Sequence, residues 1–367
     1  MALGAGVTVS HYGANSTTAT DRRNPMLKRL TNTLAAGLAA AGLAAGAASA
    51  DVELTYSSWL PWTHPVNVHI FIPWMEAIEK DSGGRIKFRR LPKPVASPPA
   101  HLDAVRTGQV DVAFSVHGYS RKQFAPYIFA EFPLLGDDAE ATSVALQRTH
   151  EKFFANLDLY GGVHLIGVNL HGPGQVHHRT KVMTSPADFE GQKFRTGGPI
   201  PQAIVEAWGG VAILQPATKS YEILSTGIAD GITFPFESLP SFGITDLVPF
   251  STVMPGGWYS SSHYLVMNRR TYDRLSPEDR AIIDKYSGEA YARLAGRGWN
   301  EINAIGLETA KKAGNTIAEA TPELKAALEE LNAKFVADYV EQVKELGLDG
   351  NEIIEYFKAQ VASLGGS

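Results

Sequence analysis

The chain has 367 residues, a length that predicts two domains of ordinary size. With 44% hydrophobic and 19% charged residues, its composition is that of a globular protein. Its net charge of −5, without a long run of basic residues, argues against a nucleic-acid partner. It contains no cysteine, which excludes disulfides, thiolate catalysis, zinc–thiolate sites and a lipid-modified cysteine anchor.

The first 50 residues have the pattern of a segment that directs export. Basic residues precede an apolar run from Leu34 to Ala47, and a small-residue cleavage pattern, Ala-Ser-Ala, follows it. The run is shorter than the roughly 18–20 residues that a membrane-spanning helix requires. We therefore predict a secretory signal, with Met1 or Met26 as the start and a mature chain from Asp51. An exported protein without cysteine indicates the bacterial periplasm.

Strands and helices alternate in the first part of the mature chain. Alternating apolar residues predict strands over 51–56, 85–90 and 110–114. Between them, apolar residues at helical spacing predict helices over 67–81 and 101–107. This β-α-β order predicts a mainly parallel sheet covered by helices.

The middle of the chain brings an arginine to the end of a predicted strand. A loop and a tight turn at Gly191 precede a short strand over 192–194, which delivers Arg195 to its end. A helix over 220–225 and a strand that begins at Ile228 are predicted to follow.

The C-terminal third is predicted to be helical. Apolar runs at 163–170 and 264–267 predict the last two clear strands before it. Capping residues and a proline predict a helix over 277–312, which is long for a globular protein, so we expect it to bridge two domains. Further helices are predicted over 322–347 and from Asp349.

Motifs for enzyme or metal chemistry are missing from the sequence. The 11 histidines show no metal-binding spacing, and the neighbours His177 and His178 would point to opposite faces of a strand. No nucleophile motif occurs, and Gly197-Gly198 lacks the lysine and serine of a phosphate-binding loop. We predict no metal, no cofactor and no catalytic residue.

Arg195 is the main candidate for ligand binding. A guanidinium is planar, permanently charged and bidentate, so it matches a carboxylate in shape and in sign. A surface or structural arginine, paired with an acidic side chain, stays an alternative. Ligands of open α/β sheets bind at strand ends, where aromatic side chains suit the walls of a pocket, although each aromatic residue has the hydrophobic core as its alternative place. The further candidates near strand ends are Trp59, His117, Tyr119, Gln175, Phe234, Glu237 and Trp258.

Five sequence blocks, in order, resemble the substrate-binding proteins of tripartite ATP-independent periplasmic (TRAP) transporters, the DctP-like family. The most specific are DFEGQKFR, which ends at Arg195, and the Tyr-Glu…Gly…Asp-Gly block, which has the family's spacing. The resemblance covers nearly the whole mature chain. The blocks are SGGRIKF (82–88), HLDAVRTGQVDVAF (101–114), SPADFEGQKFR (185–195), YEILSTGIADG (221–231) and HYLVMNRRTYDRLSPEDRAII (263–283).

The resemblance implies a two-lobed α/β fold of the periplasmic binding protein type (type II-like). Each lobe would have a mixed sheet flanked by helices, and a long helix would bridge the two. Lobe I would comprise 51–172 and 260–300, and lobe II would comprise 173–259 and 301–367 with the C-terminal helices. Such proteins close around a ligand, usually a small organic acid, and deliver it to a permease with a small and a large membrane subunit. A monomer and a homodimer both stay open.

The resemblance also implies roles for single residues. Arg195 corresponds to the arginine that contacts the ligand carboxylate in this family. Some members, sialic-acid binders among them, have a second arginine about where Gln175 stands and an asparagine where Phe234 stands. The loss of these polar groups favours a monocarboxylate with a compact or apolar body, such as a keto, hydroxy or aromatic acid, and Gln175 would donate to its oxygens. Glu237 would pair with a ligand hydroxyl or amine, or lie outside the pocket.

We therefore predict a periplasmic solute-binding protein of a TRAP transporter that captures its ligand by domain closure. Two alternatives stay open. An exported enzyme acting on a small acid would need a general acid or base near the arginine, and His117 or Glu237 could serve. A periplasmic sensor would deliver the ligand to a receptor instead of a permease.

Overall fold

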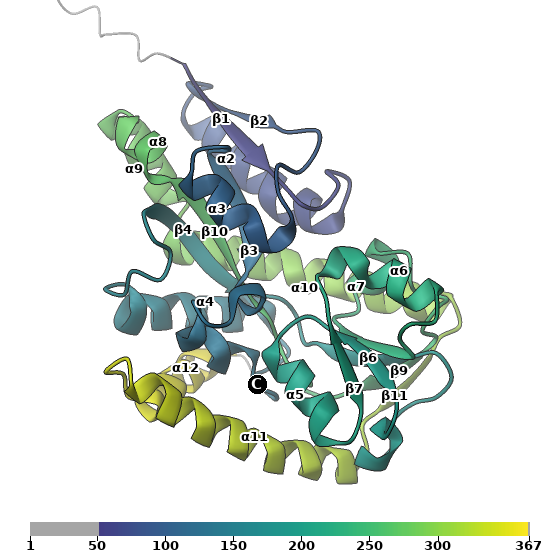
Figure 1. The fold of residues 1–367 in the computed structure, drawn as a ribbon. Coiled ribbons are helices and arrows are strands. Elements are labelled where there is room, and N and C mark those ends of the chain that lie inside the picture. Colours follow the sequence, from purple (N-terminus) through teal and green to yellow (C-terminus); the bar gives the residue numbers. More distant parts are fainter. Residues whose placement is uncertain (1–50, 366–367) are drawn as a thin grey trace, which may run out of the picture. The chain divides into compact units, whose positions relative to one another are not determined.

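The strands of residues 51–365, the part of the chain that the structure describes, form two sheets (Figure 1). The structure is a computed structural model, and the signal predicted in residues 1–50 lies outside the described residues. The sheet with the order β2-β1-β3-β10-β4 defines lobe I, and the sheet with the order β11-β9-β5-β8-β6-β7 defines lobe II. The strands of lobe I are β1 (Val52–Ser57), β2 (Ile86–Arg90), β3 (Val112–Val116), β4 (Val163–Leu170) and β10 (Ser262–Asn268). The strands of lobe II are β5 (Gln175–His178), β6 (Lys193–Thr196), β7 (Val211–Leu214), β8 (Gly231–Phe234), β9 (Phe250–Val253) and β11 (Thr316–Glu319).

Both sheets are mixed. In lobe I, β1 pairs in parallel with β2 and β3, whereas β10 lies antiparallel between β3 and β4. In lobe II, β6 pairs in parallel with β7 and β8, whereas β5 lies antiparallel between β8 and β9. The parallel order predicted for 51–56, 85–90 and 110–114 is confirmed, since these segments pair in parallel as β1, β2 and β3. In each of the two sheets one strand, β10 or β5, runs against the others, and a local pattern of apolar residues does not reveal that reversal. The mixed sheets confirm the fold class that the resemblance implies.

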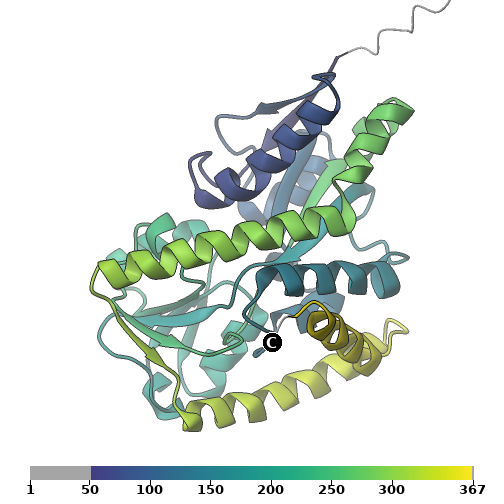
Figure 2. The ribbon, with the colours of Figure 1, turned by 180° about the vertical axis from the view of Figure 1, so that it is seen from behind.

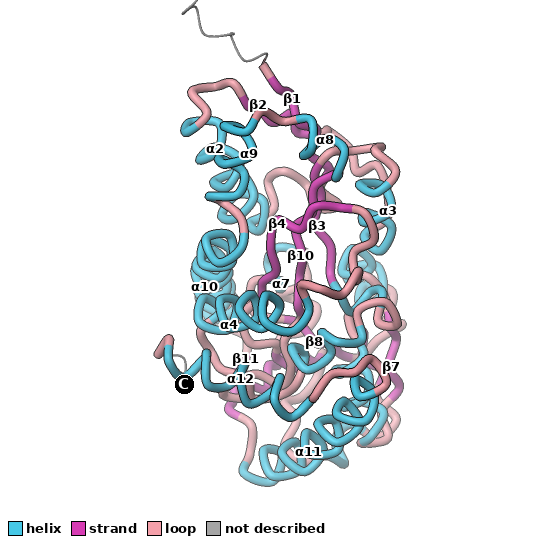
Figure 3. Tube along the Cα trace, turned by 90° about the vertical axis from the view of Figure 1, so that its left-hand side faces the viewer, coloured by secondary structure: helices cyan, strands magenta, loops and turns pink. Residues whose placement is uncertain are grey.

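Helices surround both sheets (Figures 1 and 3). The predicted helix over 67–81 is found as a π-helical turn, Asn67–Phe71, that continues into α2. No helix within residues 51–365 combines the length and the apolar character that crossing a membrane requires. The helices are α2 (Ile72–Asp81), α3 (His101–Arg106), α4 (Ala139–Thr149), α5 (Pro199–Ala207), α6 (Ser220–Ser225), α7 (Ser238–Ser241), α8 (Arg269–Arg274), α9 (Pro277–Lys285), α10 (Gly288–Lys312), α11 (Pro322–Lys344) and α12 (Gly350–Ser363).

The long helix predicted over 277–312 is two helices, α9 and α10. Between them Ser287 has an extended backbone, and Gly288 has a φ of +58°. Glycine adopts a positive φ readily, and such a residue interrupts the run of helical dihedrals. The predicted bridge between the lobes is confirmed for α10, which packs against α4 of lobe I and α7 of lobe II (Figure 2).

Two glycines let α10 approach its neighbours closely. A Cβ atom at Gly298 would lie 2.6 Å from Cγ1 of Ile70, and one at Gly306 would lie 2.5 Å from Cα of Glu237. Glycine inside a helix costs roughly 0.5–1 kcal/mol relative to alanine, so its presence here reflects this close packing. As a result, α10 supports the backbone of Glu237 directly.

Helix α11 is also joined to both lobes (Figure 2). At its start the Thr321 hydroxyl donates to the Thr184 carbonyl of lobe II at 2.6 Å. Nearer its end the Tyr339 hydroxyl donates to the Pro126 carbonyl of lobe I at 2.9 Å. Helix α12 follows and packs against α4. Two helices therefore connect the lobes, in addition to the crossing segments of the chain.

The buried apolar side chains of the described residues form two clusters, and each draws on both lobes. Phe124 of lobe I and Phe194 of lobe II belong to one cluster, and Phe114 and Phe234 belong to the other. The described residues accordingly lie within one compact unit of the chain. The second cluster borders the cavity that contains Arg195.

Candidate ligand-binding site

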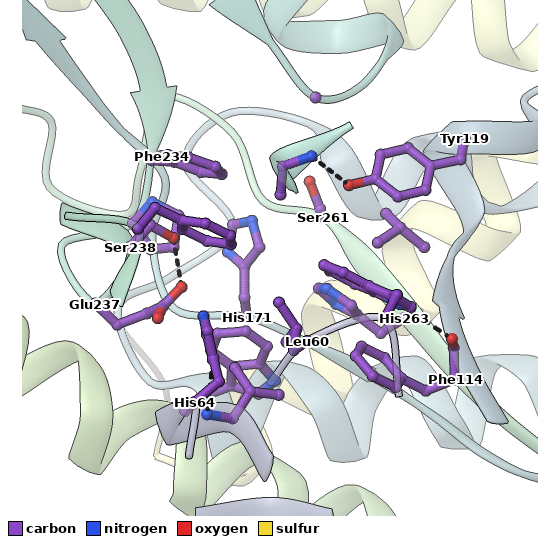
Figure 4. Close-up of a pocket in the computed structure, with 18 of the residues that line it drawn as sticks. Leu60, His64, Phe114, Tyr119, His171, Phe234, Glu237, Ser238, Ser261 and His263 are labelled. Carbon is purple, nitrogen blue, oxygen red and sulfur yellow. Dashed lines mark hydrogen bonds between the residues drawn. The ribbon is translucent and has the colours of Figure 1, made fainter. Parts of the chain in front are cut away.

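A cavity lies between the lobes, and side chains of both line it (Figure 4). The space between these side chains that protein atoms do not fill, the part open to solvent included, is about 530 Å³. Lobe I contributes Trp59, Leu60, His64, Phe114, Val116 and Tyr119. Lobe II contributes Arg195, Ala217, Phe234, Glu237, Ser238 and Phe242. The crossing segments and α10 contribute His171, Tyr259, Ser261, His263 and Trp299.

Arg195 is placed by the turn and strand that the sequence predicts. A capping box at Ser185 and a turn at Gly191, with a φ of +69°, lead the chain into β6. Because β7 and β8 pair with β6 on its two sides, the backbone at Arg195 is held inside the sheet. A Cβ atom at Gly197 would lie 3.2 Å from Nη2 of Arg195, so the glycine leaves room for the guanidinium.

The Arg195 guanidinium is buried without a carboxylate partner. The residue is 1% exposed, and no ion pair among residues 51–365 includes it. Its Nε and Nη2 donate to the Gln215 carbonyl at 3.0 and 2.6 Å, whereas Nη1 has no hydrogen-bond partner. Burial lowers the pKa of Arg195, but a guanidinium keeps its charge in proteins. A buried cation with a free donor is costly, so the arrangement suits an anionic ligand.

Flat aromatic faces from both lobes border the cavity. In lobe II the rings of Phe234 and Phe242 stack, with centroids 5.4 Å apart and planes inclined by 6°. In lobe I the rings of Trp59 and Phe114 stack at 4.9 Å and 29°. Cζ of Arg195 lies 4.4 Å from the centroid of the Phe234 ring, at which distance the ring attracts the cation. Phe234 therefore orients the guanidinium and also contributes an apolar wall.

A hydrogen bond joins the two lobes beside the cavity. Tyr119 lies in the 3-10 turn His117–Ser120 of lobe I, and its hydroxyl accepts from the Ala217 N–H of lobe II at 3.1 Å (Figure 4). Burial raises the pKa of Tyr119, so the phenol is neutral at physiological pH. Its ring also meets Trp59 edge to face at 6.5 Å. Tyr119 thus contacts both lobes in this conformation.

Glu237 and His64 supply polar groups to the cavity. Glu237 precedes α7, and its carboxylate accepts from the Ser238 hydroxyl and, at 3.1 Å, from the Ser241 hydroxyl. Burial raises the pKa of Glu237 to about 7. His64 Nδ1 accepts from the Val66 N–H at 3.3 Å, and its Nε2 has no partner. Burial lowers the pKa of His64 to about 4, so the ring is neutral at neutral pH.

His171, His263 and Trp299 form a further wall. The His263 ring lies 5.9 Å from the His171 ring and 5.3 Å from the Trp299 ring. Burial lowers the pKa of His171 to about 4 and that of His263 to about 3, so both are neutral at neutral pH. Among the described residues that line the cavity, Arg195 is therefore the one positive charge.

Gln175 and Trp258, both predicted site residues, lie away from the cavity. Both polar atoms of the Gln175 amide are hydrogen-bonded to the backbone of Met254. Its oxygen accepts from the Met254 N–H at 2.8 Å, and its nitrogen donates to the Met254 carbonyl at 3.2 Å. Trp258 is buried, and its Nε1 donates to the Thr252 carbonyl at 2.9 Å. Both residues stabilise lobe II instead of facing a ligand. The predicted residues that do line the cavity are Trp59, Tyr119, Arg195, Phe234 and Glu237.

His117 also lies outside the cavity lining. Its Nδ1 bonds to the Ser262 hydroxyl at 2.9 Å and its Nε2 to the Tyr160 hydroxyl at 2.7 Å. The ring stacks on Tyr127 at 4.0 Å, and burial holds its pKa well below the usual range. With both nitrogens used inside lobe I, His117 is not placed to act as a base beside Arg195.

Several lining residues are not found by sequence reasoning. Phe114 and His263 belong to the apolar strands β3 and β10, and Trp299 belongs to the apolar face of α10. For each of them the sequence pattern therefore predicts a place in the hydrophobic core. Phe242 follows α7 in a segment without a recognisable motif. His64 is an exception, because it lies close to the candidate Trp59 in the sequence.

No group of three or more His, Cys, Asp or Glu side chains within residues 51–365 is arranged to hold a metal ion. His177 bonds to the Ser251 hydroxyl at 2.8 Å and to the Phe234 carbonyl at 3.0 Å. Its neighbour His178 bonds to the Gln192 side chain at 3.2 Å. The two adjacent histidines thus have different partners, as their alternation on β5 predicts.

Comparison with known proteins decides the family. The model of the family described as bacterial extracellular solute-binding protein, family 7, matches residues 58–342. The chain belongs to this family. The match confirms the resemblance to the substrate-binding proteins of TRAP transporters.

Solved structures of TRAP solute-binding proteins are similar to this chain over most of its length. One from Bordetella bronchiseptica, with bound (R)- and (S)-mandelate, is 39% identical, has a TM-score of 0.83, and is matched over 85% of this chain and 99% of its own. One from a marine metagenome, specific for aromatic acids and bound to 3-hydroxybenzoate, is 29% identical with a TM-score of 0.81, over 86% and 99% of the two chains. A curated relative, the outer membrane transporter protein TsaT of Comamonas testosteroni, is 27% identical over 84% of this chain and 92% of its own.

Family membership settles the general function. The protein is the solute-binding component of a TRAP transporter, located in the periplasm, and works with the membrane permease. It binds a small acid and is a transport protein, not an enzyme, so the alternative of an exported enzyme is not retained. The identity of the acid depends on the cavity of this chain.

Proposed function

We propose that the protein captures an aromatic monocarboxylate, whose carboxylate binds Arg195 and whose ring lies among the aromatic walls. The observation that carries this proposal is the buried guanidinium with an unpartnered Nη1 and no acidic neighbour. The stacked pairs Phe234–Phe242 and Trp59–Phe114 offer flat apolar faces. Mandelate and 3-hydroxybenzoate, the ligands of the two similar structures, are acids of this class.

The charges in the cavity favour one carboxylate over two. Arg195 is the one cation among the described lining residues, and the Glu237 carboxyl lies in the same cavity. A dicarboxylate would bring its second carboxylate into a cavity that has no second cation and contains an acid. Like charges in a site of low dielectric repel strongly, so succinate or a similar ligand fits poorly.

Capture would proceed by closure of the two lobes. The carboxylate binds Arg195 of lobe II, lobe I closes over the ring, and the exclusion of water strengthens the ion pair. One moving body would comprise residues 51–172 and 260–300, and the other would comprise residues 173–259 and 301–367. The closed form would then dock on the small and large permease subunits. Because residues of a single chain complete the cavity, we propose a monomer as the working unit.

Calorimetric titration of the purified protein with a panel of acids tests the ligand class. Benzoate, mandelate and 3-hydroxybenzoate are expected to bind at least about a hundredfold more tightly than succinate or galacturonate, a difference of about 2.7 kcal/mol. The apolar ring contacts and the single cation are the reasons. Tighter binding of succinate or galacturonate would overturn the proposal.

Tyr119→Phe is expected to weaken benzoate binding about three- to tenfold, the effect of one lost hydrogen bond. The ring that packs on Trp59 is kept, but the Ala217 N–H loses its acceptor across the lobes. Tyr221→Phe, at an exposed tyrosine of lobe II, is the matched control and should bind like the wild type. Calorimetry decides the point, and equal affinity of the Tyr119→Phe variant would show that this bond does not stabilise the closed form.

A further inference from the structure

The cavity contains a hydrogen-bond donor on His64 and hydrogen-bond acceptors on Glu237 that are not fully satisfied by protein groups. His64 Nδ1 accepts the Val66 N–H, and a neutral imidazole carries one proton, so that proton resides on Nε2. Nε2–H is therefore a buried donor without a partner, on a residue that is 5% exposed. The Glu237 oxygens accept from two serine hydroxyls and still have free lone pairs. Buried polar groups normally find partners, so this pair is incomplete.

The pair lies away from the arginine. The guanidinium lies over Phe234, the Phe234 ring stacks on Phe242, and the His64 ring packs on Phe242 at 5.2 Å. Two aromatic rings, those of Phe234 and Phe242, thus lie between His64 and Arg195 along the wall. Phe242 directly follows α7, and Glu237 directly precedes it, so both members of the pair belong to the surroundings of this short helix. Figure 4 shows Glu237 and His64 at the same end of the view, opposite Tyr119.

We propose that His64 and Glu237 form a second subsite, which binds a hydroxyl group on the ring at the end remote from the carboxylate. This rests on the proposed function, since the ring must first be anchored by Arg195. A hydroxyl accepts from Nε2–H and donates to the Glu237 carboxylate at the same time. A ring amine donates but accepts poorly, and a methyl group or hydrogen does neither, so both leave Nε2–H unpartnered. A site built around buried hydrogen-bonding groups discriminates against analogues that lack them.

The test compares matched acids on the wild type and on two variants by calorimetry. The probes are benzoate, 3- and 4-hydroxybenzoate, and 3- and 4-aminobenzoate. The wild type is expected to bind at least one hydroxybenzoate about tenfold or more tightly than benzoate and than the aminobenzoate of the same position. In His64→Phe, which keeps a ring against Phe242, and in Glu237→Gln, which keeps the shape of the side chain, this ratio should fall to about threefold or less.

His69→Phe is the control, because this histidine belongs to the same segment but does not line the cavity, and it should keep the wild-type ratio. A wild-type ratio near one for both hydroxybenzoates, with benzoate binding that still requires Arg195, overturns the subsite and leaves the proposed function standing. A high ratio that persists in both variants also overturns it, because the hydroxyl would then be recognised elsewhere. If no aromatic acid binds the wild type, the proposed function fails and the subsite fails with it.

Discussion

Replacing Arg195 with methionine is expected to weaken the binding of benzoate by about a hundredfold or more, while the protein stays folded. Truncating one partner of a buried charge pair costs about 2–5 kcal/mol, and Arg195 is the one cation among the described lining residues. Methionine fills much of the volume of the arginine stem without a charge. Calorimetry measures the loss, and thermal unfolding of the ligand-free variant checks the fold.

The ligand-free protein gives this substitution a second readout. A buried guanidinium without a counter-ion destabilises the empty protein, so the melting temperature of the ligand-free Arg195→Met variant should equal or exceed that of the wild type. Lys193→Met is the matched control, since it removes a positive charge from the same strand at an exposed position. Affinity that is unchanged in Arg195→Met, or lost equally in Lys193→Met, would contradict the role of Arg195.

Glu131→Gln is expected to stabilise the protein at pH 8 and to have little effect near pH 4.5. Glu131 is 2% exposed, its Oε2 has no partner, and its carboxyl lies against Gly118 of lobe I and Gly198 of lobe II. Burial raises its pKa to about 8. Between pH 4.5 and 8 the unfolded chain releases this proton and the folded protein retains it, so the free energy of unfolding falls as the pH rises. A glutamine has no proton to release, which gives the variant an advantage of roughly 4 kcal/mol at pH 8.

Urea unfolding of wild type and variant at both pH values measures this difference. Glu237, whose pKa is raised to about 7, contributes in the same direction but is present in both proteins, so it cancels. Glu206→Gln on α5, at an exposed position, is the control and should change stability equally at both pH values. A Glu131→Gln effect that does not depend on pH would show that this carboxyl is ionised in the folded protein.

The parts of the fold that follow from sequence are those with local signals. The predicted helix over 220–225 and the predicted strand over 163–170 coincide with α6 and β4. The break at Gly288 is not visible in the sequence, because α10 also contains glycines that do not interrupt it. What separates Gly288 from them is a positive φ, which depends on how α9 and α10 pack. The lobe boundaries taken from the family stay a prediction.

The residues of the candidate site also differ in whether a local sequence signal marks them. Arg195 could be singled out because a turn, a short strand and a glycine pair surround it within a few residues. Gln175 has an equally polar position at the start of β5, but its amide is bound by Met254 on the neighbouring chain segment. Gln175 and Met254 are about eighty residues apart in the sequence, and the pairing of β5 with β9 brings them together. No local sequence pattern predicts this pairing. His64 and Glu237 are far apart in the sequence, and they line one cavity because lobe I and lobe II lie against each other there.

A crystal structure of the protein with benzoate or 3-hydroxybenzoate would show directly whether Arg195 binds the carboxylate. We expect one molecule between the lobes, with a carboxylate oxygen about 2.7–2.9 Å from a nitrogen of Arg195 and the ring between Phe234 and Trp59. A carboxylate bound away from Arg195, or a molecule outside this cavity, would contradict this expectation.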